Sequence, residues 1–322
     1  MNIVWLVLLP GVLAMPRIHL PTGNDLPDQQ RSAPLLYTPP PSPRIPRFAA
    51  IGDPVPSGKL QFVAALTIRS VKRDNYGDVI LLRMTPAPIC SGVQISSRHI
   101  LTAAHCLYDI DQLSAYCRST ELSDRTDIPV EKKDTSDLVV HLGSRCDTNF
   151  DCWISQRFYE HKKISIHPGY KHCYASNDLA LIELKNEVPS EKSQPISMPK
   201  AHESISTPLT AAGYGTNNSR TKYSPGLQEV VYYQYEEDPR TITTYSSTQT
   251  ICEGDSGGPL FQTDQQGKYV LMGIANSVRG KHTHCAPDRF NTFTDIRKHL
   301  EWICEKTGVC PNESNRKATR GR

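Results

Sequence analysis

The sequence lacks a strong charge imbalance and, beyond its first residues, any long apolar run. The chain has 36 Lys and Arg residues against 33 Asp and Glu residues, and the basic residues are scattered. A scattered, nearly balanced charge argues against a nucleic-acid partner. No stretch after residue 15 is apolar over the roughly 20 residues that a membrane-spanning helix needs, so we expect no membrane partner.

Metal ligands at suitable spacing are also missing. The nearest Cys and His neighbours, His172-Cys173 and His284-Cys285, lack a second pair that would complete a zinc site. We therefore expect no metal ion and no other cofactor. The ten cysteines instead predict disulfides, which form in an oxidising compartment.

The first residues predict export from the cell. Residues 1–15 are apolar apart from Asn2, but Pro10-Gly11 interrupts the run, which is too short to span a bilayer. The segment therefore resembles a signal peptide, residues 1–14, cut near Ala14. Together with the cysteines it predicts a secreted, extracellular protein.

The segments before and after the expected folded domain have compositions that predict no hydrophobic core. Residues 15–47 contain nine prolines and few large apolar side chains, and such a stretch stays extended. We weigh a linker against a propeptide, and we favour a propeptide that a protease removes by cutting after Arg47 or Arg44. Residues 305–322 predict a basic, disordered tail.

From residue 58 onward the composition changes to short β-rich runs. Residues 61–68, 78–84, 90–95 and 99–102 predict strands, and residues 73–78 predict a turn between the first two. Many short strands indicate an antiparallel, all-β barrel architecture. Near the end, Ile296, Leu300 and Ile303 follow a helical period within residues 295–306, which predicts a C-terminal helix.

One ten-residue stretch, residues 251–260, points to nucleophilic chemistry: Ile-Cys-Glu-Gly-Asp-Ser-Gly-Gly-Pro-Leu. Its glycines let the backbone turn tightly, so that Ser256 projects its hydroxyl while the amides of Gly254 and Ser256 point at one spot. A serine hydroxyl also needs a base and an orienting carboxylate. The candidates are His105, in Leu-Thr-Ala-Ala-His-Cys, and Asp178, in Asn-Asp-Leu-Ala-Leu.

These three segments, in the order His, Asp, Ser, resemble the signatures of the chymotrypsin-like (trypsin fold) serine peptidases. The resemblance implies a peptidase domain over residues 48–304, with two antiparallel six-stranded β-barrels and a C-terminal helix. It implies a secreted serine endopeptidase, a hydrolase, with catalytic His105, Asp178 and Ser256 and an oxyanion hole made by the Gly254 and Ser256 amides. Its partners would be polypeptide substrates, an activating protease and protein inhibitors.

The resemblance also implies a zymogen. In that family a cleavage creates an amine that pairs with the acid before the catalytic serine, here Asp255. The sequence departs from the family at this point, because residues 48–52 read Phe-Ala-Ala-Ile-Gly rather than a β-branched pair before two glycines. The departure keeps a second interpretation open, a peptidase homologue that binds or regulates without turnover. An esterase with the same triad has no supporting motif.

The substrate pocket that the resemblance implies is not acidic. Counted from Ser256, the floor position that is aspartate in trypsins is Thr250, and the wall position is Asn291. The substrate-pairing strand lies within residues 273–280 and contributes Asn276, Ser277 and Val278. We therefore expect a neutral pocket and little cleavage after Arg or Lys, unless a gap in the loop brings Asp288 into it.

The resemblance implies the disulfides Cys90–Cys106 and Cys252–Cys285. The other six cysteines allow fifteen pairings, among which the sequence does not choose: Cys117, Cys146, Cys152, Cys173, Cys304 and Cys310. Residues 227–251 contain no cysteine, so a disulfide that family members usually have there is missing. Two sequons, at Asn217 and Asn312, predict glycosylation.

Overall fold

The computed structural model describes residues 52–76, 79–84, 88–109, 134–143, 158–171, 173, 176–216, 224–279, 285 and 287–311. For residues 70–73, 79–84 and 277–279 it describes the backbone alone. The expected signal peptide (1–14) and propeptide (15–47) lie outside the described residues. So do both sequons, at Asn217 and Asn312, and most of the expected tail.

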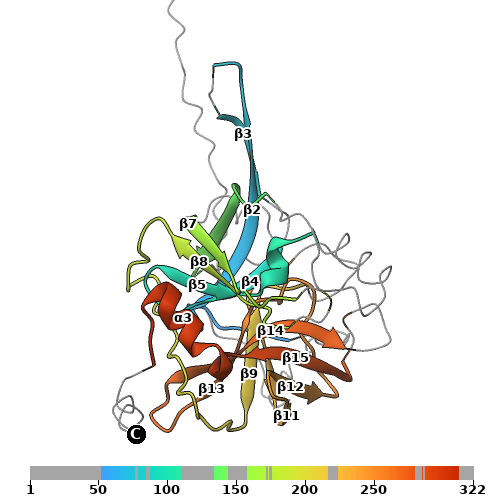
Figure 1. Cartoon of the computed structure of the whole chain (residues 1–322). Helices are drawn as coiled ribbons and strands as arrows, with labels where there is room; N and C mark the ends of the chain where they lie inside the picture. Colours follow the sequence, from blue (N-terminus) through green and yellow to red (C-terminus); the bar gives the residue numbers. More distant parts are fainter. Residues whose placement is uncertain are drawn as a thin grey trace, which may run out of the picture. The chain divides into compact units, whose positions relative to one another are not determined.

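Six strands of the first half close into a barrel. In order around it they are β2 (Val63–Arg73), β4 (Cys90–Gln94), β5 (His99–Thr102), β8 (Ala180–Leu184), β7 (Phe158–Ile166) and β6 (Leu138–Leu142). The ring closes because β2 pairs with β4 along one edge and with β6 along the other. This is the first of the two barrels that the resemblance implied (Figure 1).

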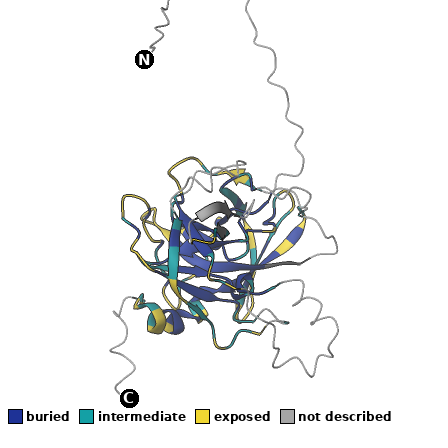
Figure 2. Ribbon diagram, turned by 90° about the horizontal axis from the view of Figure 1, so that it is seen from above, coloured by how far each residue is buried: buried dark blue, intermediate teal, exposed yellow. Residues whose placement is uncertain are grey.

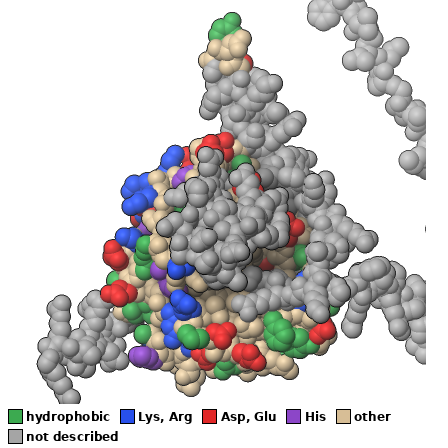
Figure 3. Space-filling model, turned by 45° about the vertical axis from the view of Figure 1, so that its right-hand side comes forward, with side chains coloured by type: hydrophobic (Ala, Val, Ile, Leu, Met, Phe, Trp, Pro, Cys, Tyr) green, Lys and Arg blue, Asp and Glu red, His purple; other side chains and the backbone are tan. Residues whose placement is uncertain are grey.

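Strand β2 continues beyond the barrel as part of a two-stranded ribbon. Residues 69–73 pair with β3 (Val79–Met84), and the ribbon stands out from the barrel in Figure 1. In Figure 3 a few coloured, described side chains mark the end of this projection. The strand predicted at 61–68 therefore runs five residues further than expected. The predicted turn follows it, where the Tyr76 amide donates to the Asp74 carboxylate over 2.9 Å.

The second half forms an eight-stranded sheet, and the second closed six-stranded barrel that we expected is not shown among the described residues. Its order is β1 (Asp53–Pro54), β10 (Gln228–Tyr232), β9 (Leu209–Gly213), β13 (Pro259–Thr263), β14 (Tyr269–Arg279), β15 (Arg289–Asp295), β12 (Thr241–Ser246) and β11 (Gln234–Glu237). Tyr233 alone separates β10 from β11, so one chain segment supplies a strand near each end of the sheet. Among the described residues no ladder joins the two ends of the sheet, although β10 and β11 belong to the same chain segment.

Buried apolar side chains form two clusters, and the first extends into the second half, where it includes Phe261, Leu271 and Ile274. The first fills the closed barrel and reaches the terminal helix, and the second lines the eight-stranded sheet around Tyr232 and Phe293. Figure 2 shows the buried residues concentrated on the strands and the exposed residues in the connections. Burial of this apolar surface is the main favourable term in folding.

The predicted C-terminal helix is confirmed. A short 3₁₀ turn, η4 (Ile296–Lys298), leads into α3 (Leu300–Thr307), and the apolar positions at 296, 300 and 303 are all buried. The helix ends at Gly308, whose φ of 73° is a left-handed conformation that suits glycine. A disulfide joins Cys304 in the helix to Cys310. Neither α3 nor any other described helix is long and apolar enough to cross a membrane.

A buried arginine ties the terminal turn to the second sheet. The Arg297 guanidinium donates to both oxygens of Asp295 (2.9 and 2.8 Å), to Glu237 Oε2 (2.6 Å) and to the Glu203 carbonyl (2.7 Å). Its side chain is 7% exposed and that of Asp295 1% exposed. Hydrogen bonds to these carboxylates, Asp295 first, raise the pKa of Arg297.

Two histidines pack between the barrel and the terminal helix. The Gly169 amide donates to His167 Nδ1 over 3.1 Å, which places the His167 proton on Nε2. That nitrogen lies 3.3 Å from His299 Nδ1, and the Trp302 ring lies 4.8 Å from the His167 ring. Burial, followed by the nearby His167, lowers the pKa of His299 to about 4.

We expect Arg297→Met to lower the free energy of unfolding by about 3–5 kcal/mol, because Asp295 would stay buried without its cation. Urea denaturation measures this loss. The control Arg98→Met breaks an ion pair with Glu187 in which both side chains are largely exposed, so it should cost less than about 1 kcal/mol. Equal losses in the two variants would contradict the role given to Arg297.

We expect His299 to destabilise the fold as the pH falls from about 6.5 to about 4. In this range an unfolded histidine takes up a proton and buried His299 does not, so the unfolded state binds more protons and the free energy of unfolding decreases, by at most about 3 kcal/mol. Urea denaturation at pH 7 and pH 4.5 should show a smaller loss for His299→Phe than for the original chain. The same loss in both chains would refute this expectation.

Candidate active site

The sequence places His105 on a single turn held against the barrel. Strand β5 ends at Thr102 and leads into η1 (Ala104–Leu107), which contains His105. The Thr102 hydroxyl donates to the Ser91 carbonyl over 2.7 Å, and a disulfide joins Cys106 to Cys90 in β4. The turn is therefore fixed on both sides of the histidine.

Asp178 reaches the histidine from the segment before β8. Its side chain is fully buried, and its Oδ1 accepts the His105 backbone amide over 2.8 Å. Its Oδ2 lies 2.6 Å from His105 Nδ1. Because a carboxylate only accepts hydrogen bonds, Nδ1 carries the ring proton and Nε2 is the basic nitrogen. The preceding residue, Asn177, has a φ of 51° and anchors the turn by donating its amide to the Gly169 carbonyl over 2.7 Å.

The loop with Ser256 is held by backbone hydrogen bonds. The Ser91 amide donates to the Ser256 carbonyl, and the Gly257 amide donates to the Ala275 carbonyl, each over 2.8 Å. Gly257 has a φ of 81°, and a side chain there would collide with the Thr102 hydroxyl and the Ser91 carbonyl. Glycine is therefore required where the loop meets the barrel.

The structure brings this loop next to the histidine turn. Cys106 Sγ lies 4.0 Å from His105 Nε2 and 3.7 Å from the Ser256 carbonyl oxygen. Ser256 itself is partly exposed. The three residues that the sequence singled out thus converge from β5–η1, the segment before β8, and the segment before β13.

Two amides of the loop point to an oxyanion site. Gly254 has a φ of 95°, and its amide and that of Ser256 donate to no acceptor within the described chain. The amide of Asp255, which lies between these two amides in the chain, donates to the Cys252 carbonyl over 3.0 Å. This bond fixes the backbone between Gly254 and Ser256. Unpaired amides of this kind suit a developing negative charge.

Asp255 is a buried carboxylate without a cation. It accepts the amides of Cys252 and Gly215, each over 2.8 Å, and burial raises its pKa to about 6. Its carboxylate packs directly on Gly213 and Gly215, where any side chain would collide with it. Among the described residues no Lys, Arg or His forms an ion pair with Asp255.

The two residues expected at the floor and wall of the substrate pocket are uncharged and hydrogen-bond to each other. The Thr250 hydroxyl donates to Asn291 Oδ1 over 2.9 Å, and both side chains are fully buried. The β14–β15 register places Ser277 opposite Thr292 and Val278 opposite Asn291, although the side chains of 277 and 278 lie outside the described residues.

The two remaining polar side chains near this pocket are already bonded. Asn276 is buried at a bulge in β14 and donates to Thr294 over 3.5 Å. Asp288 is exposed and accepts a hydrogen bond from Tyr245. The structure therefore does not place Asp288 at the pocket floor.

One residue of the site was missed from the sequence. The Ser91 hydroxyl donates to the Gly254 carbonyl (2.8 Å) and accepts the Tyr214 amide (2.9 Å), so it joins the barrel to both loops around Asp255. Its position directly after Cys90 was the available signal, since that disulfide fixes the strand beside the site. A serine within a strand gave no other indication.

Two of the three possible metal ligands grouped at His105 are joined to each other in a disulfide. Cys90, His105 and Cys106 lie close together, but both cysteines are in the disulfide and so offer no thiolate. A second disulfide joins Cys252 to Cys285, the other pair that the resemblance implied. Cys173 is also disulfide-bonded, while Cys117, Cys146 and Cys152 lie outside the described residues.

Comparison with known proteins identifies relatives along the described domain. The chain is 28% identical over 244 residues to clotting factor C of Tachypleus tridentatus, a match that spans 66% of this chain and 22% of that protein. It is 30% identical over 236 residues to the venom peptide isomerase heavy chain of Agelenopsis aperta, a match that spans 67% of this chain and 86% of that protein. It is 25% identical over 235 residues to a collagenase of Hypoderma lineatum, a match that spans 68% of this chain and 76% of that protein. Since the Trypsin family model matches residues 52–156 and 154–303, the chain belongs to the trypsin family of serine-type endopeptidases.

Proposed function

We propose that this chain is a secreted serine endopeptidase that cleaves polypeptides through an acyl-enzyme on Ser256. The observation that carries the proposal is the 2.6 Å bond between Asp178 Oδ2 and His105 Nδ1, with Ser256 on the adjoining loop. This bond fixes the imidazole so that Nε2 is available as a base. The disulfides support an oxidising, extracellular location.

Each residue has a defined step in the proposed reaction. His105 Nε2 takes the proton of Ser256 as its oxygen attacks the peptide carbonyl carbon, and Asp178 stabilises the imidazolium that forms. The amides of Gly254 and Ser256 donate to the oxyanion of the tetrahedral intermediate. His105 then gives its proton to the leaving amine, and water repeats the sequence to release the acid and regenerate Ser256.

We propose that the peptidase is made as a zymogen, and Asp255 supports this. A buried carboxylate with no cation is costly, so an incoming ammonium group would be strongly favoured there. Cleavage after Arg47 or Arg44 would create one. Strand β1 lies close to this position, because Pro54 pairs with Gln228, which pairs with Gly213 against the Asp255 carboxylate.

Labelling with a fluorophosphonate probe, which reacts with an activated serine, tests the proposal. We expect labelling of the chain cut after Arg47, about a hundredfold less labelling of the uncut chain, and none of Ser256→Ala. Equal labelling of cut and uncut chains would refute the zymogen. No labelling of any folded form would refute the peptidase and favour the second interpretation, a homologue that binds without turnover.

We propose that the primary pocket accepts small neutral side chains. The fully buried Thr250–Asn291 pair satisfies its own polar groups and offers no negative charge. A Lys or Arg side chain in such a pocket would be buried without a counter-ion, which is costly.

We expect kcat/KM for peptide anilides ending in Ala or Val to exceed that for Arg by at least about a hundredfold, or about 2.7 kcal/mol. Thr250→Asp adds a carboxylate at the floor of the substrate pocket and should lower the ratio of kcat/KM for Ala or Val to kcat/KM for Arg. Thr248→Asp, at an exposed position nearby, should leave this ratio unchanged. Rapid cleavage after Arg by the original chain would overturn the neutral pocket.

A further inference from the structure

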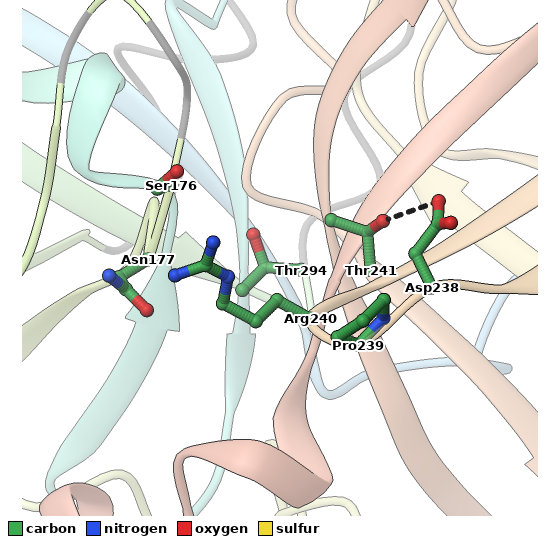
Figure 4. A pocket seen from close by; sticks show the side chains of 7 residues that line it. All are labelled: Ser176, Asn177, Asp238, Pro239, Arg240, Thr241 and Thr294. Carbon is green, nitrogen blue, oxygen red and sulfur yellow. Dashed lines mark hydrogen bonds between the residues drawn. The ribbon is translucent and has the colours of Figure 1, made fainter.

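A separate pocket of about 300 Å³ lies beside the segment that carries Asp178. Three parts of the chain line it: Ser176 and Asn177 before the aspartate, the β11–β12 turn with Asp238 and Arg240, and Thr294 in β15. Figure 4 shows Arg240 extending from the turn across the pocket towards Asn177 and Ser176. Neither the triad nor the expected substrate pocket uses these side chains, apart from the weak Asn276–Thr294 bond.

Arg240 presents an unneutralised cation. Its guanidinium forms no ion pair or hydrogen bond with any described residue, whereas Arg69, Arg98 and Arg297 each pair with a glutamate at 2.9, 3.0 and 2.6 Å. Its backbone is nevertheless fixed, because its carbonyl accepts the Asp295 amide over 3.0 Å. An arginine on a fixed backbone, without an ion-pair partner among the described residues, is suited to bind a carboxylate from another molecule.

The neighbouring carboxylate does not neutralise it. Asp238 accepts the Thr241 hydroxyl over 3.2 Å, and Figure 4 shows both on the far side of the turn from the Arg240 guanidinium. The Asp238 amide also donates to the Thr241 carbonyl over 2.9 Å, which keeps the turn in this form. The pocket thus has a cation at its centre and an anion at its margin.

The other side chains offer donors that suit a carboxylate. The Thr294 hydroxyl is buried and accepts only a long bond of 3.5 Å from Asn276, so its own proton remains available. The Ser176 side chain has no partner within the described chain and is partly exposed. One guanidinium and two hydroxyls match the single charge and two oxygens of an Asp or Glu side chain.

We propose that this pocket is an exosite that binds an acidic side chain of the polypeptide substrate. The inference rests on the proposed peptidase function, because the pocket adjoins the segment that carries the catalytic aspartate. A long polyanion fits it poorly, since Asp238 stands at its margin and would repel further negative charge. The substrates that it selects are polypeptides with an Asp or Glu outside the cleaved bond.

The test measures binding in the full chain carrying Ser256→Ala, so that it does not depend on turnover. The probes are two fluorescein-labelled dodecapeptides of alternating Ala and Gly with one central substitution, Glu in the first and Gln in the second, compared by fluorescence anisotropy. We expect the Glu peptide to bind about fivefold more tightly, as one partly exposed charge pair contributes.

Three further substitutions in that chain locate the effect. Arg240→Gln should abolish the difference between the peptides, and Asp238→Asn should widen it by removing the negative charge at the margin of the pocket. Arg98→Gln removes the same charge from the other half of the domain and should leave the difference intact. Because Asp238→Asn acts in the opposite direction, misfolding does not mimic the expected pattern.

Equal binding of the two peptides, or equal losses in Arg240→Gln and Arg98→Gln, would overturn the exosite. That failure is distinct from failure of the peptidase proposal, because fluorophosphonate labelling reads Ser256 alone. A chain that is labelled but binds both peptides equally refutes only the exosite. A chain that is not labelled but shows the charge-dependent binding refutes the peptidase and retains the pocket as a peptide-binding site.

Discussion

The arrangement of the candidate active site depends on the buried carboxylate of Asp178. A fully buried charge must be satisfied, and here the partner is a histidine 73 residues earlier, bonded through both its ring and its backbone amide. The fold makes this meeting unavoidable, because Thr102 at the end of β5 pairs with Ala180 at the start of β8. The histidine turn and the aspartate segment therefore leave the barrel at the same edge.

The loop that carries Ser256 depends on contacts between the closed barrel and the eight-stranded sheet. Ser91, in the barrel, accepts or donates three hydrogen bonds with loop residues of the second half. Glycine at 257 allows the two halves to approach, since a side chain there would collide with the Ser91 carbonyl and the Thr102 hydroxyl of the barrel. The site thus lies where the halves meet, and neither half contains all of it.

Two charges near this meeting place lack partners of opposite sign within the described chain. Asp255 is buried within the loop that carries Ser256, and burial raises its pKa to about 6. Arg240 is exposed beside the aspartate segment. An unpaired buried carboxylate and an unpaired, positioned guanidinium favour the binding of a cation and an anion respectively, which is why we assign a new chain terminus to the first and a substrate side chain to the second.

The sequence by itself determined the features that local pattern encodes. The glycines around Ser256, the order of the three motifs, the turn at residues 73–78 and the helical period of Ile296, Leu300 and Ile303 each depend on neighbours in the chain. Tertiary structure alone decided that residues 228–237 pair with both β9 and β12, that Ser91 joins the two halves, and that Arg240 faces Asn177 across a pocket. These features depend on which strand edges are already paired and on side chains far apart in sequence, and no local pattern of residues specifies such pairings.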